Sequence, residues 1–243
     1  MLSTIYHTVL YQPLYNILVF FYNIVPGHDI GLAIILLTVV VKIILWPFFS
    51  QSIRAQRAMQ GIQPKIDELK QKYKDDKQKL GPALMELYKK EKVSPFSSCL
   101  PLLLQLPFLI AVYKVFSVGL SNGSLDAVYP FIYNPGSINP VSLGLINLSQ
   151  PSIVMAVLAG ASQFWQSKIM FAKQPLAGDK NSTMAIMNKQ MTYFMPLITV
   201  FIGASLPAGL TFYWLIITVL GIVQQAWVFK KLDTSKVEVI NQR

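Results

Sequence analysis

Residues 30–49 read IGLAIILLTVVVKIILWPFF, an apolar run of 20 residues interrupted by one charge, Lys42. About 20 apolar residues in a helix cross the roughly 30 Å hydrocarbon core of a bilayer. At about 1.5 Å per residue, Lys42 lies about 18 Å along this helix, slightly past its midpoint. An unpaired ammonium at that depth costs roughly 2.5–3.5 kcal/mol. Because no apolar run of the chain contains Asp or Glu, Lys42 is predicted to face water held inside the protein. The alternative is a lysine that snorkels to the surface from a span of different register.

The composition of the other segments also indicates a membrane protein. Of the 243 residues, 53% are hydrophobic and 13% are charged, which is typical of a polytopic helical membrane protein. Lysine and arginine gather in three segments, with 11 of the 21 between Arg54 and Lys92, four in 168–189 and four in 230–243. Residues 1–29 and 119–152 contain none. The positive-inside rule therefore places the N-terminus outside and the C-terminus in the cytoplasm.

The sequence predicts an all-α polytopic membrane protein with five transmembrane helices. The predicted spans are residues 30–50, 94–118, 153–171, 190–205 and 208–229. An extracytoplasmic loop at 119–152, a cytoplasmic loop at 172–189 and a cytoplasmic tail at 230–243 complete this topology. The chain shows no internal repeat, which counts against many secondary-transporter folds.

Residues 1–29 are rich in aromatic side chains and lack the basic start of a signal peptide. Gln12, Pro13, Asn16 and Asn23 interrupt the apolar residues, which fall at helical spacing on one side. We therefore expect an amphipathic helix in the outer interface, with tyrosines at the level of the headgroups. A further membrane span is the alternative.

Residues 51–93 change abruptly to a charged sequence with two apolar stripes at helical spacing. The Lys-Asp-Asp-Lys run at 74–77 separates the stripes, so an antiparallel cytoplasmic helical hairpin is predicted, with a solvated basic loop as the alternative. Its 11 basic and six acidic residues give a net charge of +5, which favours anionic lipid or ribosomal RNA. The residues predicted to recruit partners are Arg54, Arg57, Lys65, Lys70, Lys89 and Lys90.

The motifs of common enzymes and metal sites are missing from the sequence. One cysteine, Cys99, and two histidines do not form a metal-binding pattern. The chain has no HExxH, no phosphate-binding glycine loop and no serine elbow. We expect no enzymatic activity, no cofactor and no metal.

Polar side chains within the predicted spans are the candidate site. They are Thr38, Lys42, Gln105, Gln163, Gln166, Tyr213 and Trp214. Taken singly, each uncharged one is explained as a helix–helix contact. Taken with an unpaired lysine, they predict a shared wet cavity for an anionic guest, such as a small anion, a lipid phosphate or an acidic polypeptide segment.

Short motifs occur in one order over nearly the whole chain. They are Lys42…Trp46-Pro47, Gln63-Pro64-Lys65-Ile66, Met85-Glu86-Leu87-Tyr88-Lys89, Val93-Ser94-Pro95, the Cys99 to Pro107 run CLPLLLQLP, Leu148-Ser149-Gln150-Pro151, Met195-Pro196, Pro207-Ala208-Gly209-Leu210…Tyr213-Trp214 and Gln224-Gln225. In these motifs the chain resembles the YidC/Oxa/Alb family of membrane-protein insertases.

The resemblance implies a five-helix core with a hydrophilic groove that is open to cytoplasm and lipid but sealed from the outside. Lys42 takes the place of the groove's basic residue, which is arginine in most bacterial relatives. Lysine keeps the charge but lacks the fork that grips a carboxylate. Thr38, Tyr213 and Trp214 match positions that line the groove or touch substrate. The hairpin corresponds to 53–92 and the outer helix to 1–25, and the large outer domain of some relatives is expected to be absent.

The expected function is insertion of single- or double-spanning proteins into a bacterial inner membrane without nucleotide hydrolysis. Expected partners are nascent membrane proteins, anionic lipids, the ribosome and the Sec translocon, but no DNA. Two other functions stay open. One is a small-anion or lipid transporter that uses Lys42 as its binding charge, and the other is a passive assembly scaffold that is indifferent to Lys42.

Overall fold

The computed structural model is mostly helical, in agreement with the predicted all-α class. The structure describes residues 4, 6–74, 76–94, 100–119, 127–171, 186 and 188–241, with the backbone alone at 100–104, 118–119 and 234–241. Most of the predicted loop at 172–189 lies outside these residues. So do residues 95–99 of the predicted second span, 120–126 of the predicted outer loop, Asp75, and the first residues of the predicted outer helix.

Within these described residues, two helices are long and apolar enough to cross a membrane. Helix α3 (Ile30–Gly61) begins at Asp29, whose side chain accepts a hydrogen bond from the Leu32 N–H, as an N-cap residue does. It continues past the predicted end of the first span at residue 50, so Arg54 and Arg57 lie on the same helix as Lys42. Helix α10 (Ala208–Asn241) likewise continues past residue 229, and its candidate membrane span lies within Ala208–Asp233.

The remaining apolar runs form shorter helices beside these two. They are α6 (Leu100–Lys114), which continues as the π-helix η4 (Val115–Gly119), then α7 (Ile153–Phe171), and α9 (Met195–Gly203), which follows the π-helix η5 (Gln190–Phe194). Helix α10 packs along both α3 and α7, and α7 also packs on α9. A Cβ on Gly160 of α7 would lie 3.0 Å from the Pro196 carbonyl oxygen, so this glycine permits close approach to α9.

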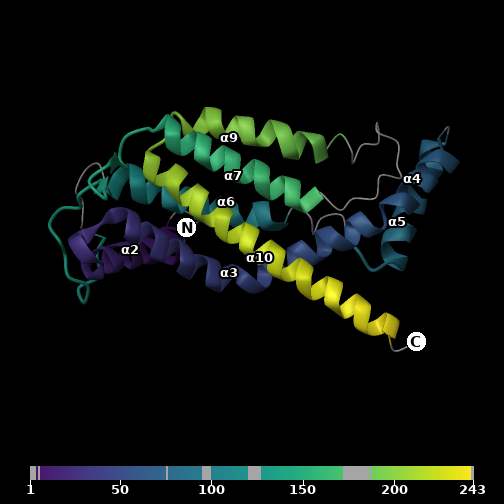
Figure 1. Ribbon diagram of the computed structural model, residues 1–243, viewed down its shortest axis with the longest axis horizontal. Coiled ribbons are helices and arrows are strands. Elements are labelled where there is room, and N and C mark those ends of the chain that lie inside the picture. Colours follow the sequence, from purple (N-terminus) through teal and green to yellow (C-terminus); the bar gives the residue numbers. More distant parts are fainter. Residues whose placement is uncertain are drawn as a thin grey trace.

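The main core lies where these helices pack against the N-terminal segment. That segment comprises the π-helix η1 (His7–Tyr11), α2 (Gln12–Ile24) and the 3₁₀-helix η2 (Pro26–His28). Helix α2 packs on α3 (Figure 1). Its Tyr15 and Leu18 are fully buried in the same cluster as Ile34, Phe116 and Tyr213.

Residues 127–152 pack against α2 and against the starts of α3 and α10. They contain two short antiparallel strands, β1 (Val141–Ser142) and β2 (Ile146–Asn147), in which Ser142 pairs with Ile146. Asn16 of α2 accepts a 2.6 Å hydrogen bond from the Tyr129 N–H. The Gly209 N–H of α10 donates to the Leu148 carbonyl oxygen at 2.8 Å. These bonds fasten the loop to the helices that flank it.

The helices α4 (Gln63–Lys72) and α5 (Lys77–Lys90) form a second, smaller cluster at the opposite end of the molecule (Figure 1). The apolar residues that pack there are Met59, Ile62, Ile66, Leu84, Leu87, Tyr88 and Val93. Lys65 near the start of α4 forms a 2.6 Å ion pair with Glu91, which follows α5. The start of α4 therefore lies beside the end of α5.

Candidate functional site

Lys42 lies on the side of α3 that faces α10, and its residue is only 6% exposed. Its ammonium is 4.5 Å from the centre of the Phe49 ring and 3.7 Å from where a Cβ on Gly221 would lie. Within the described part of the chain, no carboxylate and no hydrogen-bond partner contacts Lys42. The site therefore holds a buried lysine that no carboxylate of the described residues compensates.

Gln166 of α7 lies beside Gly221 of α10, as Lys42 of α3 does. Its Nε2 would lie 2.4 Å from a Cβ on Gly221, so the absence of a side chain there lets the amide approach α10. Lys42, Phe49, Gln166 and Gly221 thus meet where α3, α7 and α10 converge, and we call this group the Lys42 site. An ammonium beside a neutral amide attracts an anionic group such as a carboxylate or a phosphate.

Further along α3 than Lys42, hydrogen bonds from Gln224 connect α10 to α3. The Nε2 of Gln224 donates to the Trp46 carbonyl oxygen and to the Ser50 hydroxyl, both at 2.9 Å. Trp46 also meets Trp227 edge-on, with ring centres 5.8 Å apart. These contacts fix the register of α10 against α3 and so set Gly221 beside Lys42.

The other residues of the predicted cavity form hydrogen bonds or packing contacts elsewhere in the helices. Thr38, one turn before Lys42, is fully buried and donates to its own helix at the Ile34 carbonyl oxygen, at 2.6 Å. Gln105 of α6 donates to the Tyr213 hydroxyl of α10 at 3.0 Å. Tyr213 precedes Gly221 by eight residues, about 12 Å along a helix. The Gln105–Tyr213 pair therefore lies nearer the start of α10 than the Lys42 site does.

Two further predicted residues also lie apart from Lys42. Gln163 of α7 accepts a hydrogen bond from the Thr199 hydroxyl of α9. Trp214 is half-buried and packs against the main core. Of the predicted polar residues, the structure thus brings Gln166 to Lys42 and places Gln105, Gln163 and Tyr213 in other helix–helix contacts.

Sequence reasoning missed two members of the Lys42 site. Phe49 follows Lys42 by seven residues, a spacing that places both on one face of a helix and was available as a signal. Gly221 stands alone among large apolar residues in a predicted span, and an isolated glycine there signals a close approach. Neither signal identifies Gln166 as the neighbour, because that depends on how α7 crosses α10.

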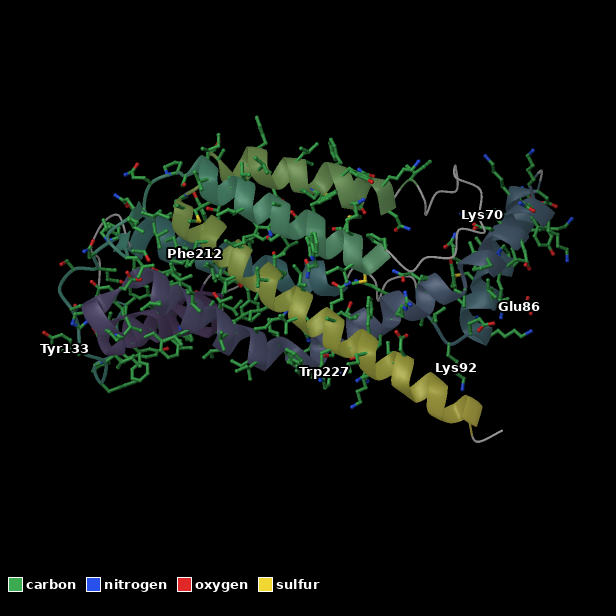
Figure 2. All side chains as sticks on the ribbon, in the orientation of Figure 1. Lys70, Glu86, Lys92, Tyr133, Phe212 and Trp227 are labelled. Carbon is green, nitrogen blue, oxygen red and sulfur yellow. The ribbon has the colours of Figure 1, made fainter. Side chains whose placement is uncertain are left out.

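The basic residues predicted to recruit partners occupy two regions. Arg54 is exposed on α3, and the half-buried Arg57 lies over the Phe229 ring of α10 at 5.1 Å. Lys65 pairs with Glu91, whereas Lys70, Lys89 and Lys90 lie in the last turns of α4 and α5. Figure 2 shows Lys70 and Glu86 at the end of the molecule opposite Tyr133, which belongs to the loop at 127–152. The basic residues of α4 and α5 are thus far from that loop.

The sequence matches the family described as "60Kd inner membrane protein" over residues 20–236. It is 35% identical over 224 residues to "Membrane protein insertase YidC" of Oleidesulfovibrio alaskensis, which covers 92% of this chain and 39% of the relative. The protein of that name from Shewanella woodyi is 37% identical over 225 residues, covering 91% of this chain and 37% of the relative. The chain therefore spans less than two fifths of the length of these curated relatives.

Proposed function

Because the chain belongs to the 60Kd inner membrane protein family, we propose that it is a membrane-protein insertase whose Lys42 site attracts the leading end of its substrate. The relatives named above are insertases by name. The observation that carries the proposal is the burial of Lys42 at 6% exposure with no carboxylate partner among the residues that the structure describes. A charge kept in that position at a cost of a few kcal/mol is explained by a function that needs it.

The proposed topology has five spans, formed by α3, α6 with η4, α7, η5 with α9, and α10. The N-terminus is outside, and α4 and α5 form a cytoplasmic hairpin. Two observations support this arrangement. Residues 54–92, which include the end of α3 together with α4 and α5, carry 11 of the 21 basic residues. Residues 127–152 at the other end carry no charge. In addition, the 19 residues of α7 span about 28 Å, close to the thickness of the hydrocarbon core.

In the proposed mechanism, the translocated polar end of a short membrane protein enters from the cytoplasm and its acidic groups are attracted to Lys42. A groove with water around Lys42 shortens the apolar distance that this end must cross. The apolar segment of the substrate then moves into lipid past Tyr213 and Trp214 on α10. Transfer of about 20 apolar residues into the bilayer drives the step, so no nucleotide is hydrolysed.

The α4–α5 hairpin supplies the first contact in this mechanism. Among the described residues, no ion pair involves Lys70, Lys89 or Lys90; Lys70 is half-buried, and Lys89 and Lys90 are exposed. They suit anionic lipid headgroups or ribosomal RNA. We propose the bacterial inner membrane as the location, nascent membrane proteins and the ribosome as partners, and cooperation with the Sec translocon.

The test is insertion of a single-span substrate with an acidic leading end into proteoliposomes. The variants are Lys42→Arg, Lys42→Ala and Lys42→Glu, each first shown to be folded and present at equal amount. Lys114→Ala is the matched control, because Lys114 is also a lysine on an apolar helix but lies over Tyr6, away from the Lys42 site. We expect wild type, Lys42→Arg and Lys114→Ala to insert the substrate, and Lys42→Ala and Lys42→Glu to fail.

Two results would contradict the proposal. Equal insertion by all Lys42 variants would leave Lys42 a structural residue and favour a passive scaffold. A wild type that inserts no substrate but moves small anions across the vesicle membrane would identify a transporter. A second substrate, whose leading acidic residues are changed to amides, serves as a control for general damage to the protein. Its insertion should depend less on Lys42, so the Lys42 variants should insert it more nearly as well as wild type does.

A further inference from the structure

The outer loop presents two apolar tips at the surface. Residues 127–152 contain no charged residue. In the first tip, Phe131 is 82% exposed and Tyr133 is 77% exposed, and in the second, Leu143 is 70% and Leu145 is 82% exposed. We call these four residues the outer-loop tips. Large apolar side chains gathered on an uncharged surface indicate a contact with a partner or a membrane.

The second tip is a β-hairpin turn with an unusual sequence. Ser142 pairs with Ile146, so Leu143, Gly144 and Leu145 form the turn between β1 and β2. Leu143 has a φ of +51° and Gly144 a φ of +69°. Such positions favour Asn, Asp or Gly, because a larger side chain is strained there. In water, Leu143 is thus unfavourable both for its backbone and for its exposure, whereas an apolar surrounding would remove the second penalty.

Hydrogen bonds hold both tips against the helices behind them. The Asn23 side chain of α2 donates to the Tyr133 carbonyl oxygen at 2.7 Å. The Leu143 N–H donates to the carboxylate of Asp29, and the Ser142 hydroxyl donates to the same carboxylate at 2.9 Å. The tips are therefore presented in fixed positions at the outer ends of α2 and α3.

The helix that follows the loop also exposes apolar side chains. Helix α7 begins directly after the loop, and its first turns expose Ile153 at 67% and Val154 at 60%. Figure 2 shows Tyr133 at the end of the molecule opposite the basic α4–α5 hairpin. That end faces the outer leaflet in the proposed topology. Tyrosine is typical of the zone between headgroups and acyl chains.

We propose that the outer-loop tips insert into the outer leaflet of the bilayer and anchor the outer ends of α2 and α3 there. The occupant is lipid, because an uncharged loop continuous with a lipid-facing helix matches the interfacial zone of a membrane. The proposal rests on the proposed topology, but it does not depend on the function assigned to Lys42.

The experiment measures the depth of single labelled positions in the full chain. In a background with Cys99→Ser, cysteine is introduced as Leu145→Cys or Phe131→Cys and labelled with an environment-sensitive fluorophore. Ser137→Cys is the matched control, because Ser137 is an exposed polar residue of the same loop. Each protein is reconstituted into phosphatidylcholine–phosphatidylglycerol vesicles with plain or bromine-substituted acyl chains.

We expect bromine to quench the label at positions 145 and 131 and to leave the label at 137 nearly unchanged. Equal quenching at all three positions, or none at 145, would overturn the proposal. A membrane-impermeant maleimide gives a second readout, applied to vesicles whose outward-facing molecules expose the loop. Protection at 145 without bromine quenching would mean that protein, not lipid, covers the tip. Full reactivity at 145 would mean that the tip lies in water.

Discussion

The ammonium of Lys42 lies 4.5 Å from the centre of the Phe49 ring, two helical turns further along the same face of α3. The negative face of an aromatic ring attracts a cation but does not neutralise its charge. Phe49 therefore stabilises the buried ammonium and leaves it able to attract an anion. A carboxylate in the place of Phe49 would cancel the charge that the proposed mechanism requires.

The first prediction concerns the coupling between these two residues. A double-mutant cycle of Lys42→Met and Phe49→Leu, measured by thermal unfolding in detergent, should give a coupling of about 0.5–2 kcal/mol. Phe48→Leu is the control, because Phe48 is 51% exposed and the ring under the Lys42 ammonium is that of Phe49. A coupling near zero for Phe49 would mean that the ring is only a packing neighbour.

The second prediction concerns the glycine at the Lys42 site. Gly221→Ala would place a methyl group 2.4 Å from the Gln166 Nε2 and force the amide to move. Because the end of a glutamine side chain yields easily, we expect little loss of stability but slower insertion of substrates with acidic leading ends. Gly81→Ala on α5 is the control, since a Cβ there meets no atom within 4 Å.

The Gly221 prediction includes a test of its cause. On a Gln166→Ala background, Gly221→Ala should slow insertion no further, because the group that it displaces is already gone. An additional loss on that background would show that the methyl group acts on Lys42 or on the substrate itself. Insertion is measured by protease protection of the translocated end in proteoliposomes.

Helix ends were less predictable from the sequence than helix positions. The start of α3 at Ile30 follows from Asp29, which caps it, and from the apolar run that it precedes. The end was expected at residue 50, where polar residues begin, but the helix continues to Gly61. Residues 51–60 include Arg, Gln, Ala and Met, which are strong helix formers. Polarity marks where a helix leaves the membrane, whereas backbone preference decides where it ends.

The sequence predicted the charged residue of the Lys42 site, but it predicted only some of the residues that surround Lys42. Lys42 stands out because a lysine in an apolar run is costly, and that signal needs no structure. Gln105 and Gln163 gave the same signal as Gln166, yet they bond to Tyr213 and Thr199 instead. Which glutamine reaches Lys42 depends on where α7 crosses α10, and helix spacing within one segment carries no information about that crossing.

The third prediction is a pH dependence that comes from Asp29, just outside α3. Partial burial raises the pKa of its carboxyl, but hydrogen bonds from the Leu143 N–H, the Leu32 N–H, the Ser142 hydroxyl and the Gly31 N–H outweigh this and hold the pKa below its usual 3.8. A lowered pKa stabilises the fold above the usual value, and this stabilisation disappears as the pH falls through the lowered pKa.

For Asp29, we therefore expect wild type to unfold at a higher temperature than Asp29→Asn at neutral pH. The difference should stay constant down to the usual carboxyl range near pH 4 and shrink below it. Ser142→Ala should weaken the pH dependence, because one donor to the carboxylate is lost. A difference that grows on acidification would mean that the fold prefers protonated Asp29. Thermal unfolding in detergent over a pH series makes the measurement.

The fourth prediction separates apolar packing from ion pairing in the α4–α5 hairpin. Ile66 is 3% exposed and packs in the cluster between the two helices. Ile66→Ala should lower the free energy of local unfolding by about 2–5 kcal/mol. Lys65→Ala removes the ion pair with Glu91, but the Lys65 side chain is 56% exposed, so the loss should be no more than about 1 kcal/mol. Hydrogen exchange of the α5 amides reports both changes. If Lys65→Ala speeds exchange more than Ile66→Ala, the ion pair rather than apolar burial holds α5 on α4. High salt would then destabilise the hairpin and, with it, the proposed recruiting surface.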